Sequence, residues 1–188
     1  MSFLDKIIEL DHKLLIFLNS LGTEQWDSFW LLITNKLTWI PLYLVLLFLL
    51  FKYHGWKKTL VLLVMISILV AFSDQFVNLI KNSAHRLRPN NDPTIKHSLR
   101  HVLNSKGYSF LSGHATTSFA VATYLILLLK KDFKPILFVL VWPLLFMYSR
   151  IYLGVHFPID VVSGLILGIS IGFIFYYLSL FVLSKTKI

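Results

Sequence analysis

The chain has 188 residues, of which 56% are hydrophobic and only 14% are charged, and its mean hydropathy is +0.72. This composition is typical of a polytopic membrane protein and excludes an ordinary soluble domain. The absence of cysteine excludes disulfides and thiolate metal sites, and the formal net charge is +9. In a membrane protein this excess of positive charge acts as a topology signal or binds anionic lipid, so no nucleic-acid partner is expected.

The first segment, residues 1–22, combines charged side chains with apolar residues at roughly helical spacing. Its charged or titratable residues are Asp5, Lys6, Glu9, Asp11, His12 and Lys13. Its apolar set is Phe3, Leu4, Ile7, Ile8, Leu14, Leu15 and Leu18. So many charges do not suit a membrane span, so we expect an amphipathic helix that lies at the interface and ends near Gly22.

Five apolar segments follow, and each is interpreted as a membrane-spanning helix. The first lies within 26–51, where Asn35 and Lys36 interrupt the early part and the fully apolar core is 37–51. The others are predicted at 59–81, 115–129, 135–148 and 159–183. The last of them predicts a seam for close helix packing, because its glycines repeat every four residues at Gly164, Gly168 and Gly172. The predicted fold class is therefore an all-α polytopic membrane bundle of five transmembrane helices plus an N-terminal interfacial amphipathic helix. We expect a single domain over residues 1–188.

The second predicted span carries a polar stripe on one helical face. The stripe consists of Ser67, Asp74, Asn78 and Lys81. Polar residues in an apolar helix face the bundle interior, so this face should point inward. A structural hydrogen-bond network is the preferred interpretation of Ser67 and Asn78, whereas for Asp74 a structural and a functional role are equally supported.

Basic turns predict the orientation of the bundle. The turns after the first and third spans hold Lys52, His54, Lys57 and Lys58, and then Lys130, Lys131 and Lys134. With five spans, both turns share a side with the C-terminus, and the positive-inside rule makes that side cytoplasmic. The opposite face receives the N-terminal helix and residues 82–111 and 149–160, and in the inner membrane of a bacterium it would be periplasmic. This face is also basic, so we expect its cations to bind substrate or take part in catalysis.

The segment 149–160 places Arg150, His156 and Asp160 between two apolar segments, where charged groups are costly unless they have a function. Pro158 suits the first position of a helix, so Asp160 falls in a first helical turn. Asp160 is then within reach of the His156 ring, and a carboxylate that holds one ring nitrogen makes the other a better nucleophile. A simple helix cap is the competing interpretation of this pair.

Two further stretches are expected on the same face, and together the three match a known signature. They read Lys81-x6-Arg88-Pro89, Ser112-Gly113-His114 and Ser149-Arg150-x5-His156-x3-Asp160. In order and spacing they resemble the type-2 phosphatidic acid phosphatase superfamily, whose signature is K-x6-RP, PSGH and SR-x5-H-x3-D and whose active site is shared with vanadium haloperoxidases. The first and third motifs match completely, and Leu111 stands where the family usually has proline.

The resemblance implies a phosphate-binding role for five residues, and elementary chemistry agrees. Lys81, Arg88 and Arg150 would neutralise the phosphoryl oxygens, whose charge must be stabilised in the transition state. Ser112 would cap a helix whose free N–H groups, including that of Gly113, bind phosphate.

The resemblance also implies three catalytic roles. His156 would attack phosphorus, Asp160 would orient it, and His114 would protonate the leaving lipid oxygen. Water would then hydrolyse the phosphohistidine. Three fixed cations take the place of a metal, so neither a metal nor another cofactor is predicted.

The remaining basic residues of the 82–111 connection give weaker predictions. His85 and Arg86 flank the first motif and are interpreted as loop surface. Lys96, His97, Arg100 and His101 are assigned to a solvated loop, with a short interfacial helix that meets anionic headgroups as the alternative.

The sequence therefore predicts an integral membrane phosphatase whose partner is a phosphorylated membrane lipid. The candidates are phosphatidic acid, phosphatidylglycerol phosphate, undecaprenyl pyrophosphate and lipid A phosphates, and the motifs do not choose among them. A vanadate-dependent haloperoxidase is disfavoured, since a lipid substrate explains a membrane site and a halide does not. A carrier of phosphorylated lipids would need the cations but not His156 with Asp160. The sequence makes no prediction about oligomeric state.

Overall fold

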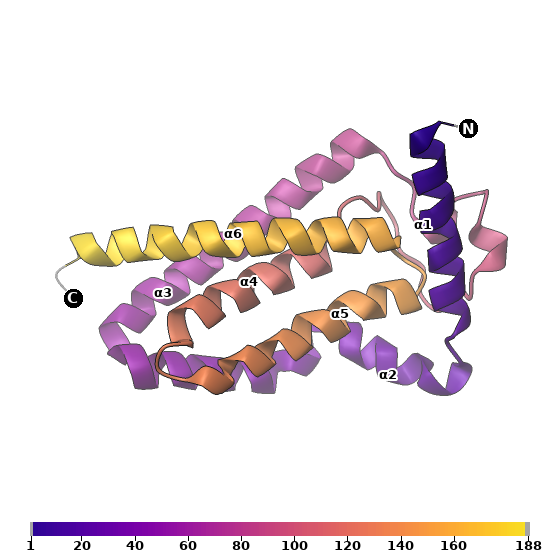
Figure 1. Cartoon of the computed structure of the whole chain (residues 1–188). Helices are drawn as coiled ribbons and strands as arrows, with labels where there is room; N and C mark the ends of the chain where they lie inside the picture. The colour runs from indigo at the N-terminus through magenta and orange to yellow at the C-terminus, as the bar shows by residue number, and fades with distance from the viewer. Residues whose placement is uncertain (1, 187–188) are drawn as a thin grey trace.

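The computed structural model describes residues 2–186, and over this range the chain is helical, without β-strands (Figure 1). Its α-helices are α1 (Phe3–Ser20), α2 (Glu24–Thr34), α3 (Ile40–Ala84), α4 (Gly113–Leu129), α5 (Val141–Tyr152) and α6 (Pro158–Lys185). Short 3-10 helices lie between them at Lys36–Trp39, Pro89–Asn91, Lys96–Ser98 and Lys134–Leu140. The predicted all-α class is therefore confirmed.

Helix α1 agrees with the helix predicted at the N-terminus, of which Met1 lies outside the described residues. It starts with a capping box, in which the Ser2 hydroxyl accepts the Leu4 N–H at 3.1 Å and the Asp5 carboxylate accepts the Ser2 N–H at 2.7 Å. Exposed apolar side chains on the helix include Phe3, Leu4, Ile8, Leu10, Leu14 and Phe17. The buried residues of the helix are Asp11, Leu15 and Asn19. The helix is amphipathic, but two of its buried side chains are polar.

The first predicted span starts after the interruption at Asn35 and Lys36. Helix α2 ends at Thr34, and the Asn35 side chain accepts the Leu37 N–H at 3.0 Å to form a tight turn before α3 begins. Asparagine favours such turns because its side chain imitates a backbone acceptor. Helix α3 then contains the rest of this segment together with the predicted second span.

Helix α3 has two arms that meet at Gly55, where the backbone has φ 70° and ψ 171°. A glycine reaches this conformation without the steric cost of a Cβ atom. Figure 1 shows the two arms meeting at the end of the bundle where the C-terminus lies. The predicted basic turn at residues 52–58 therefore lies at a sharp bend inside one assigned helix.

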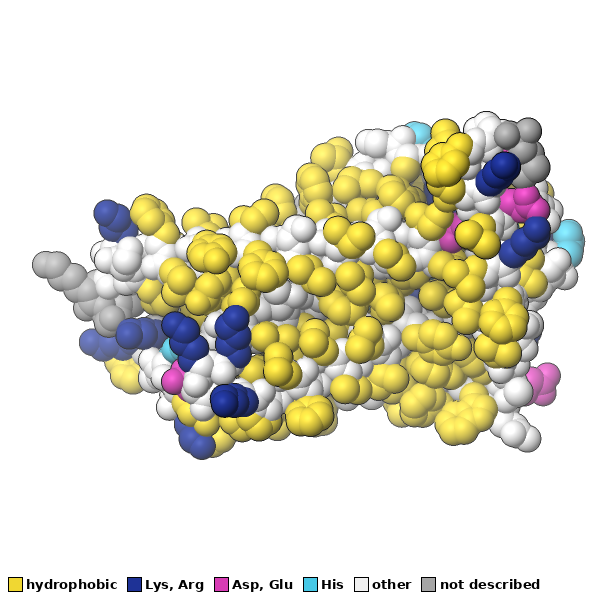
Figure 2. Space-filling model, in the orientation of Figure 1, with side chains coloured by type: hydrophobic (Ala, Val, Ile, Leu, Met, Phe, Trp, Pro, Cys, Tyr) yellow, Lys and Arg dark blue, Asp and Glu magenta, His cyan; other side chains and the backbone are white. Residues whose placement is uncertain are grey.

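Three helical stretches of the described chain are long and apolar enough to cross a membrane: Lys36–Asn91, Lys134–Tyr152 and Pro158–Lys185. Helix α4 is a shorter apolar helix of 17 residues. The fourth predicted span extends beyond 148, because its first turns are the 3-10 helix Lys134–Leu140 and α5 continues to Tyr152. Figure 2 shows hydrophobic side chains over most of the visible middle of the molecule, as a membrane protein requires.

The predicted glycine seam is formed between α6 and α4. A Cβ atom on Gly168 would lie 2.4 Å from the Thr116 carbonyl oxygen, and one on Gly172 would lie 2.7 Å from that of Ala120. A Cβ atom on Gly164 would come within 2.8 Å of the Ser112 carbonyl oxygen. The two backbones therefore pack directly on each other, which places the start of α4 beside the start of α6.

Candidate active site

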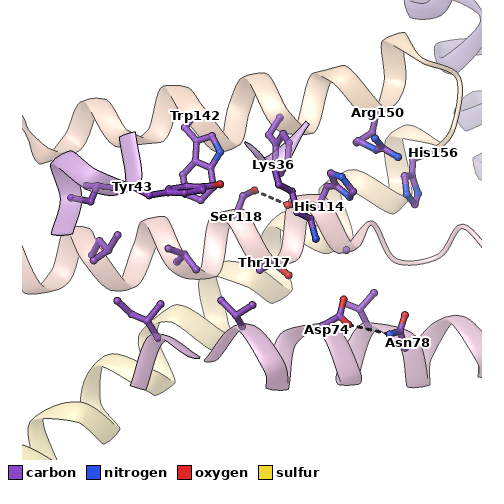
Figure 3. A pocket seen from close by; sticks show the side chains of 18 of the residues that line it. Lys36, Tyr43, Asp74, Asn78, His114, Thr117, Ser118, Trp142, Arg150 and His156 are labelled. Atoms are coloured by element: carbon purple, nitrogen blue, oxygen red, sulfur yellow. Dashed lines mark hydrogen bonds between the residues drawn. The ribbon is translucent and has the colours of Figure 1, made fainter. Parts of the chain in front are cut away.

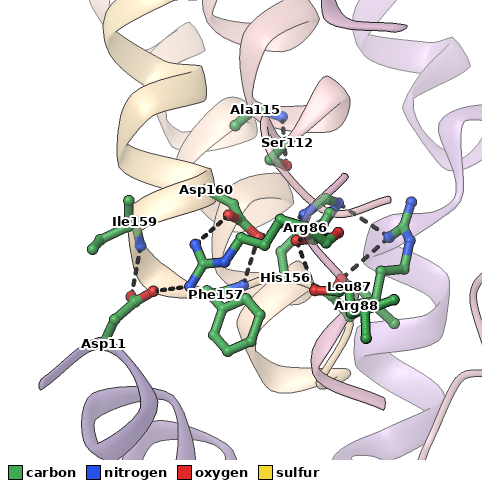
Figure 4. Close-up of polar contacts among 12 residues, drawn as sticks. Asp11, Arg86, Leu87, Arg88, Ser112, Ala115, His156, Phe157, Ile159 and Asp160 are labelled. Carbon is green, nitrogen blue, oxygen red and sulfur yellow. Dashed lines mark hydrogen bonds and ion pairs between the residues drawn. The ribbon is translucent and has the colours of Figure 1, made fainter. Parts of the chain in front are cut away.

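His156 lies in the short connection between α5 and α6 and is only 1% exposed. Its Nδ1 atom is 3.4 Å from Oδ2 of the fully buried Asp160, and its Nε2 atom is 3.3 Å from Nη1 of Arg88 (Figure 4). Asp160 Oδ2 also accepts the Phe157 N–H at 3.0 Å. The carboxylate therefore caps its own helix and faces the histidine at the same time, so the two interpretations of this pair do not exclude each other.

Cationic side chains surround this histidine. Arg88 is held by the carbonyl oxygens of Val155, at 3.2 Å from Nη1, and of Lys106, at 3.0 Å from Nε. Arg150 is buried, and its Nη1 atom donates to the Thr34 hydroxyl at 2.5 Å. Its Nε atom is buried without a partner among residues 2–186. The two guanidinium groups are thus fixed in place while part of the hydrogen-bonding capacity of Arg150 is unused.

The charge around His156 determines its protonation state. Burial, together with the positive charges of Arg150, Arg88 and Lys81, lowers the pKa of His156 well below its usual value of 6.5. The ring is therefore neutral at physiological pH. A neutral imidazole has the free electron pair that a nucleophile needs.

Ser112 caps α4, as predicted. Its hydroxyl accepts the Ala115 N–H at 3.5 Å, and its own N–H donates to the Asp160 carbonyl oxygen at 3.1 Å. The start of α4 is thereby tied to the first turn of α6. The N–H groups of the first turn, including that of Gly113, have no acceptor within the helix and form an anion-binding end. Leu111 is buried, and the cap that follows it is formed.

A cavity of about 580 Å³ opens beside these groups and runs between α3, α4 and α5 (Figure 3). Its polar part is lined by Lys81, Arg88, Gly113, His114, Arg150 and His156. Its apolar part is lined by residues such as Leu46, Leu50, Leu63, Val121, Leu125 and Trp142. Ser112 and Asp160 lie behind this lining. A cavity with one cationic part and one apolar part suits an anionic amphiphile.

His114 projects into the cavity from the first turn of α4. Its ring packs against Phe146 with 4.9 Å between the ring centroids, and Figure 3 shows it on the same side as Arg150 and His156. All the residues predicted for the site thus come together around the polar part of the cavity or directly behind it.

Arg86 is not a loop-surface residue, so that prediction is wrong. Its Nη1 atom contacts Asp160 Oδ1 at 2.7 Å, and its Nη2 atom contacts Asp11 Oδ2 at 2.6 Å (Figure 4). Arg100 also differs from a solvated residue, since it pairs with Asp27 of α2 at 2.9 Å. No spacing rule connects Asp11 with Arg86, because they are 75 positions apart.

The polar stripe of α3 divides into two parts. Asp74 and Asn78 line the cavity, and the Asn78 amide nitrogen is 3.4 Å from Asp74 Oδ2. The Ser67 hydroxyl instead donates to the Leu63 carbonyl oxygen of its own helix at 3.0 Å, as a structural role predicts. Lys36, which the sequence analysis did not single out, also lines the cavity.

Metal ligands are scarce around the cavity. Between residues 2 and 186, no group of three or more His, Asp or Glu side chains is placed to hold a metal ion.

Comparison with known proteins gives one family. The sequence profile of the PAP2 superfamily matches residues 58–182. The chain is 35% identical over 175 residues to the lipid A 4'-phosphatase of Bacteroides thetaiotaomicron, covering 91% of this chain and 77% of that protein. It is 29% identical over 187 residues to the lipid A 4'-phosphatase of Porphyromonas gingivalis, covering 97% and 78% respectively.

Two solved structures share the fold. The transmembrane PAP2-type phosphatidylglycerolphosphate phosphatase of Bacillus subtilis has a TM-score of 0.74 at 20% identity, covering 97% of this chain and 89% of that one. Aquifex aeolicus LpxE has a TM-score of 0.64 at 23% identity, covering 88% and 93% respectively.

Proposed function

This chain belongs to the PAP2 superfamily, and we propose that it is a membrane phosphatase that hydrolyses a lipid phosphate or lipid pyrophosphate. The observation that carries the proposal is the meeting of buried cations and a neutral His156 at one part of an otherwise apolar cavity. The relatives with the broadest coverage are named for lipid A 4'-phosphate, so a lipid A phosphate is the first substrate to test. The apolar lining favours a lipid over a halide.

Five residues bind the phosphate in this proposal. Lys81, Arg88 and Arg150 neutralise its oxygens, and the charge that develops in the transition state strengthens these contacts. The first turn of α4, at Ser112 and Gly113, supplies backbone N–H groups to the same oxygens.

Two histidines divide the chemistry. The unprotonated Nε2 atom of His156 attacks phosphorus while Asp160 holds Nδ1–H, and the bond to the leaving lipid oxygen breaks as His114 protonates that oxygen. His114 must therefore be protonated when substrate is bound, which the phosphate dianion beside it favours. Water then attacks the phosphohistidine while the now neutral His114 takes a proton from it, the P–N bond breaks, and inorganic phosphate and free His156 are released.

The reaction needs no metal ion in this proposal. Fixed cations perform the charge neutralisation that magnesium performs in many phosphoryl-transfer enzymes.

The proposed topology has five membrane spans, formed by the two arms of α3, by α4, by the α5 segment and by α6, in one domain with the N-terminal helix at the interface. Figure 2 shows Lys and Arg side chains gathered at the end of the molecule near the C-terminus. The positive-inside rule places that end in the cytoplasm. The active site then faces the opposite, extracytoplasmic side of the plasma (inner) membrane.

The roles of the two histidines predict different substrate dependence. His156→Ala should abolish turnover of lipid phosphate and of p-nitrophenyl phosphate alike. His114→Ala should lower lipid phosphate turnover ~10²–10⁴-fold, the usual contribution of a general acid. It should largely spare the first burst of nitrophenol from the aryl phosphate, because nitrophenolate leaves without a proton. The measurement is a stopped-flow burst of nitrophenol from purified protein in detergent, with excess EDTA.

His97→Ala is the matched control, since His97 is an exposed histidine of the 82–111 connection. It should behave like the unmodified protein. Equal loss of the burst in both active-site variants, or a burst that survives His156→Ala, would contradict the assigned roles. A burst that appears only after a divalent ion is added would contradict the metal-free reaction.

The topology predicts the accessibility of two engineered cysteines. The chain has no cysteine of its own, so Lys57→Cys and Lys106→Cys each introduce a unique label site on an exposed residue. In sealed vesicles of known orientation, an impermeant thiol reagent should label Lys57→Cys only from the cytoplasmic side and Lys106→Cys only from the other. Labelling of both from one side would rule out the proposed arrangement.

A further inference from the structure

Arg86 joins the N-terminal helix to the acid beside His156. One arm of its guanidinium group contacts Asp160 of α6 at 2.7 Å, and the other contacts Asp11 of α1 at 2.6 Å. The guanidinium carbon lies 3.8 Å from the centre of the Phe157 ring, and the His12 ring stacks on the same phenylalanine at 5.1 Å. The arginine is therefore fixed by two ion pairs and by an aromatic face.

These contacts restrict the Asp160 carboxylate to one orientation. Oδ1 is occupied by Arg86, so Oδ2 is directed toward the Phe157 N–H and toward Nδ1 of His156. A fully buried carboxylate without a cationic partner is costly, and Arg86 provides that partner. Rotation of the carboxylate away from His156 would break the ion pair with Arg86.

Asp11 completes the arrangement from the other side. It is buried, and its Oδ1 atom accepts the Ile159 N–H of the first turn of α6 at 2.9 Å while Oδ2 holds Arg86. Both ends of the ion-pair chain are thus anchored to the same helical turn. If α1 only anchored the protein at the membrane interface, a buried carboxylate on its inner face would be costly and would have no purpose.

We propose that Asp11 and Arg86 are positioning residues of the phosphatase, through which helix α1 holds Asp160 against His156. This inference rests on the proposed function and adds the N-terminal helix to the elements that position the catalytic residues. Neither residue touches the phosphate, so both act on the attack by His156 and not on substrate binding.

The test measures the phosphorylation step in two variants, Arg86→Gln and Asp11→Asn. The asparagine keeps an oxygen that can accept the Ile159 N–H but removes the negative charge that pairs with Arg86. The rate constant of the nitrophenol burst should fall about 10- to 100-fold, which is the size of effect that follows when the group orienting a metal-ligating histidine is removed. Burst amplitude and KM should change little, because the folded fraction and the phosphate cations are preserved. Asp160→Asn should lower the rate constant at least as much, and Arg86→Gln should have no further effect in that background.

Arg100→Gln is the matched control. The Arg100 side chain is 26% exposed against 23% for Arg86, and it also pairs with a carboxylate, but that carboxylate is Asp27. Its burst should be unchanged. Two results would show that Arg86 has only a structural role and would overturn the proposal. The first is a lower burst amplitude with an unchanged burst rate constant in Arg86→Gln. The second is a decrease in the rate constant that adds fully to the decrease caused by Asp160→Asn. Absence of any burst in the unmodified protein would instead contradict the proposed function.

A different observation concerns Asp74, a carboxylate in the wall of the lipid cavity (Figure 3). It precedes Lys81 by seven residues, which places it about 10 Å further along the helix. An acid inside an apolar helix is costly, and this one also repels the phosphate, so it is not a phosphate ligand. Asn78 and Thr117 add further polar groups to the same wall.

We infer that Asp74 accepts a hydrogen bond from a hydroxyl or amide N–H group of the lipid, within about 10 Å of its phosphate. Carboxylate oxygens accept hydrogen bonds, so Asp74 favours lipids that carry a donor there. In a diacylglycerol phosphate, the groups at this distance from the phosphate are ester oxygens, which accept hydrogen bonds and cannot donate one to Asp74. This inference also rests on the proposed function and narrows its substrate class to donor-bearing lipid phosphates.

Two phospholipids with matched chains test this selectivity: ceramide 1-phosphate, which has an amide N–H and a hydroxyl, and dipalmitoyl phosphatidic acid, which has neither. The unmodified protein should turn over the ceramide phosphate with a kcat/KM about 10-fold higher or more, since a site that hydrogen-bonds a donor of its substrate discriminates against an analogue without that donor. Asp74→Leu should remove this preference by lowering activity on the ceramide phosphate alone.

Ser67→Ala on the same helix is the control, and it should keep the preference, because the Ser67 hydroxyl bonds within its own helix. Equal loss of activity on both lipids in Asp74→Leu would mean that Asp74 supports Lys81 and not the substrate. That outcome, or the lack of any preference in the unmodified protein, would overturn the inference. Failure to release phosphate from either lipid would contradict the proposed function itself.

Discussion

The crowding of positive charge around one buried histidine is the constraint on which the site depends. Burial, together with the charges of Arg150, Arg88 and Lys81, lowers the pKa of His156, and Arg86 lies directly behind Asp160. Set against these four cations are two buried carboxylates, Asp160 and Asp11. Like charges in a region of low dielectric repel strongly, so the excess of positive charge at the polar part of the cavity is unfavourable until an anion enters. The same excess of positive charge keeps His156 neutral and attracts a phosphate.

The helix packing maintains this arrangement despite the repulsion. Glycines of α6 lie directly against the backbone of α4, and the Ser112 N–H is bonded to the Asp160 carbonyl oxygen. The starts of the two helices are therefore fixed at van der Waals distance. A Cβ atom added at Gly164 would lie only 2.8 Å from the Ser112 carbonyl oxygen. Such a substitution would therefore displace the start of α4 even though it alters none of the site residues.

Local sequence predicts the residues of the site better than it predicts what supports them. His156 and Asp160 are four residues apart at a helix start, so their contact follows from helix geometry, and Ser112 caps α4 for a similarly local reason. The contact between Asp11 and Arg86 joins segments 75 residues apart and depends on how α1 packs across the bundle. No local pattern contains that information, which is why Arg86 was assigned to the loop surface.

The helix boundaries show the same limit. Hydropathy places the first span within 26–51 and leaves its start open, and the Asn35 turn separates α2 from α3 there. A bend at Gly55 can be predicted from local sequence, since a positive φ angle suits glycine. The directions of the two arms of α3 cannot, because they depend on how the arms pack against the other helices. Motif spacing therefore predicts which side chains meet, whereas the length of an apolar segment does not predict where a helix begins and ends.

The central claim is that His156 becomes phosphorylated. The most direct test mixes radiolabelled aryl phosphate with the His114→Ala protein, in which the intermediate should break down slowly if His114 also takes the proton of the attacking water. An alkaline quench preserves phosphohistidine, and peptide mapping then locates the label. The account predicts an acid-labile label on the peptide that contains His156, and none when His156→Ala is added. A label on another residue, or turnover of the substrate without any labelled protein, would contradict it.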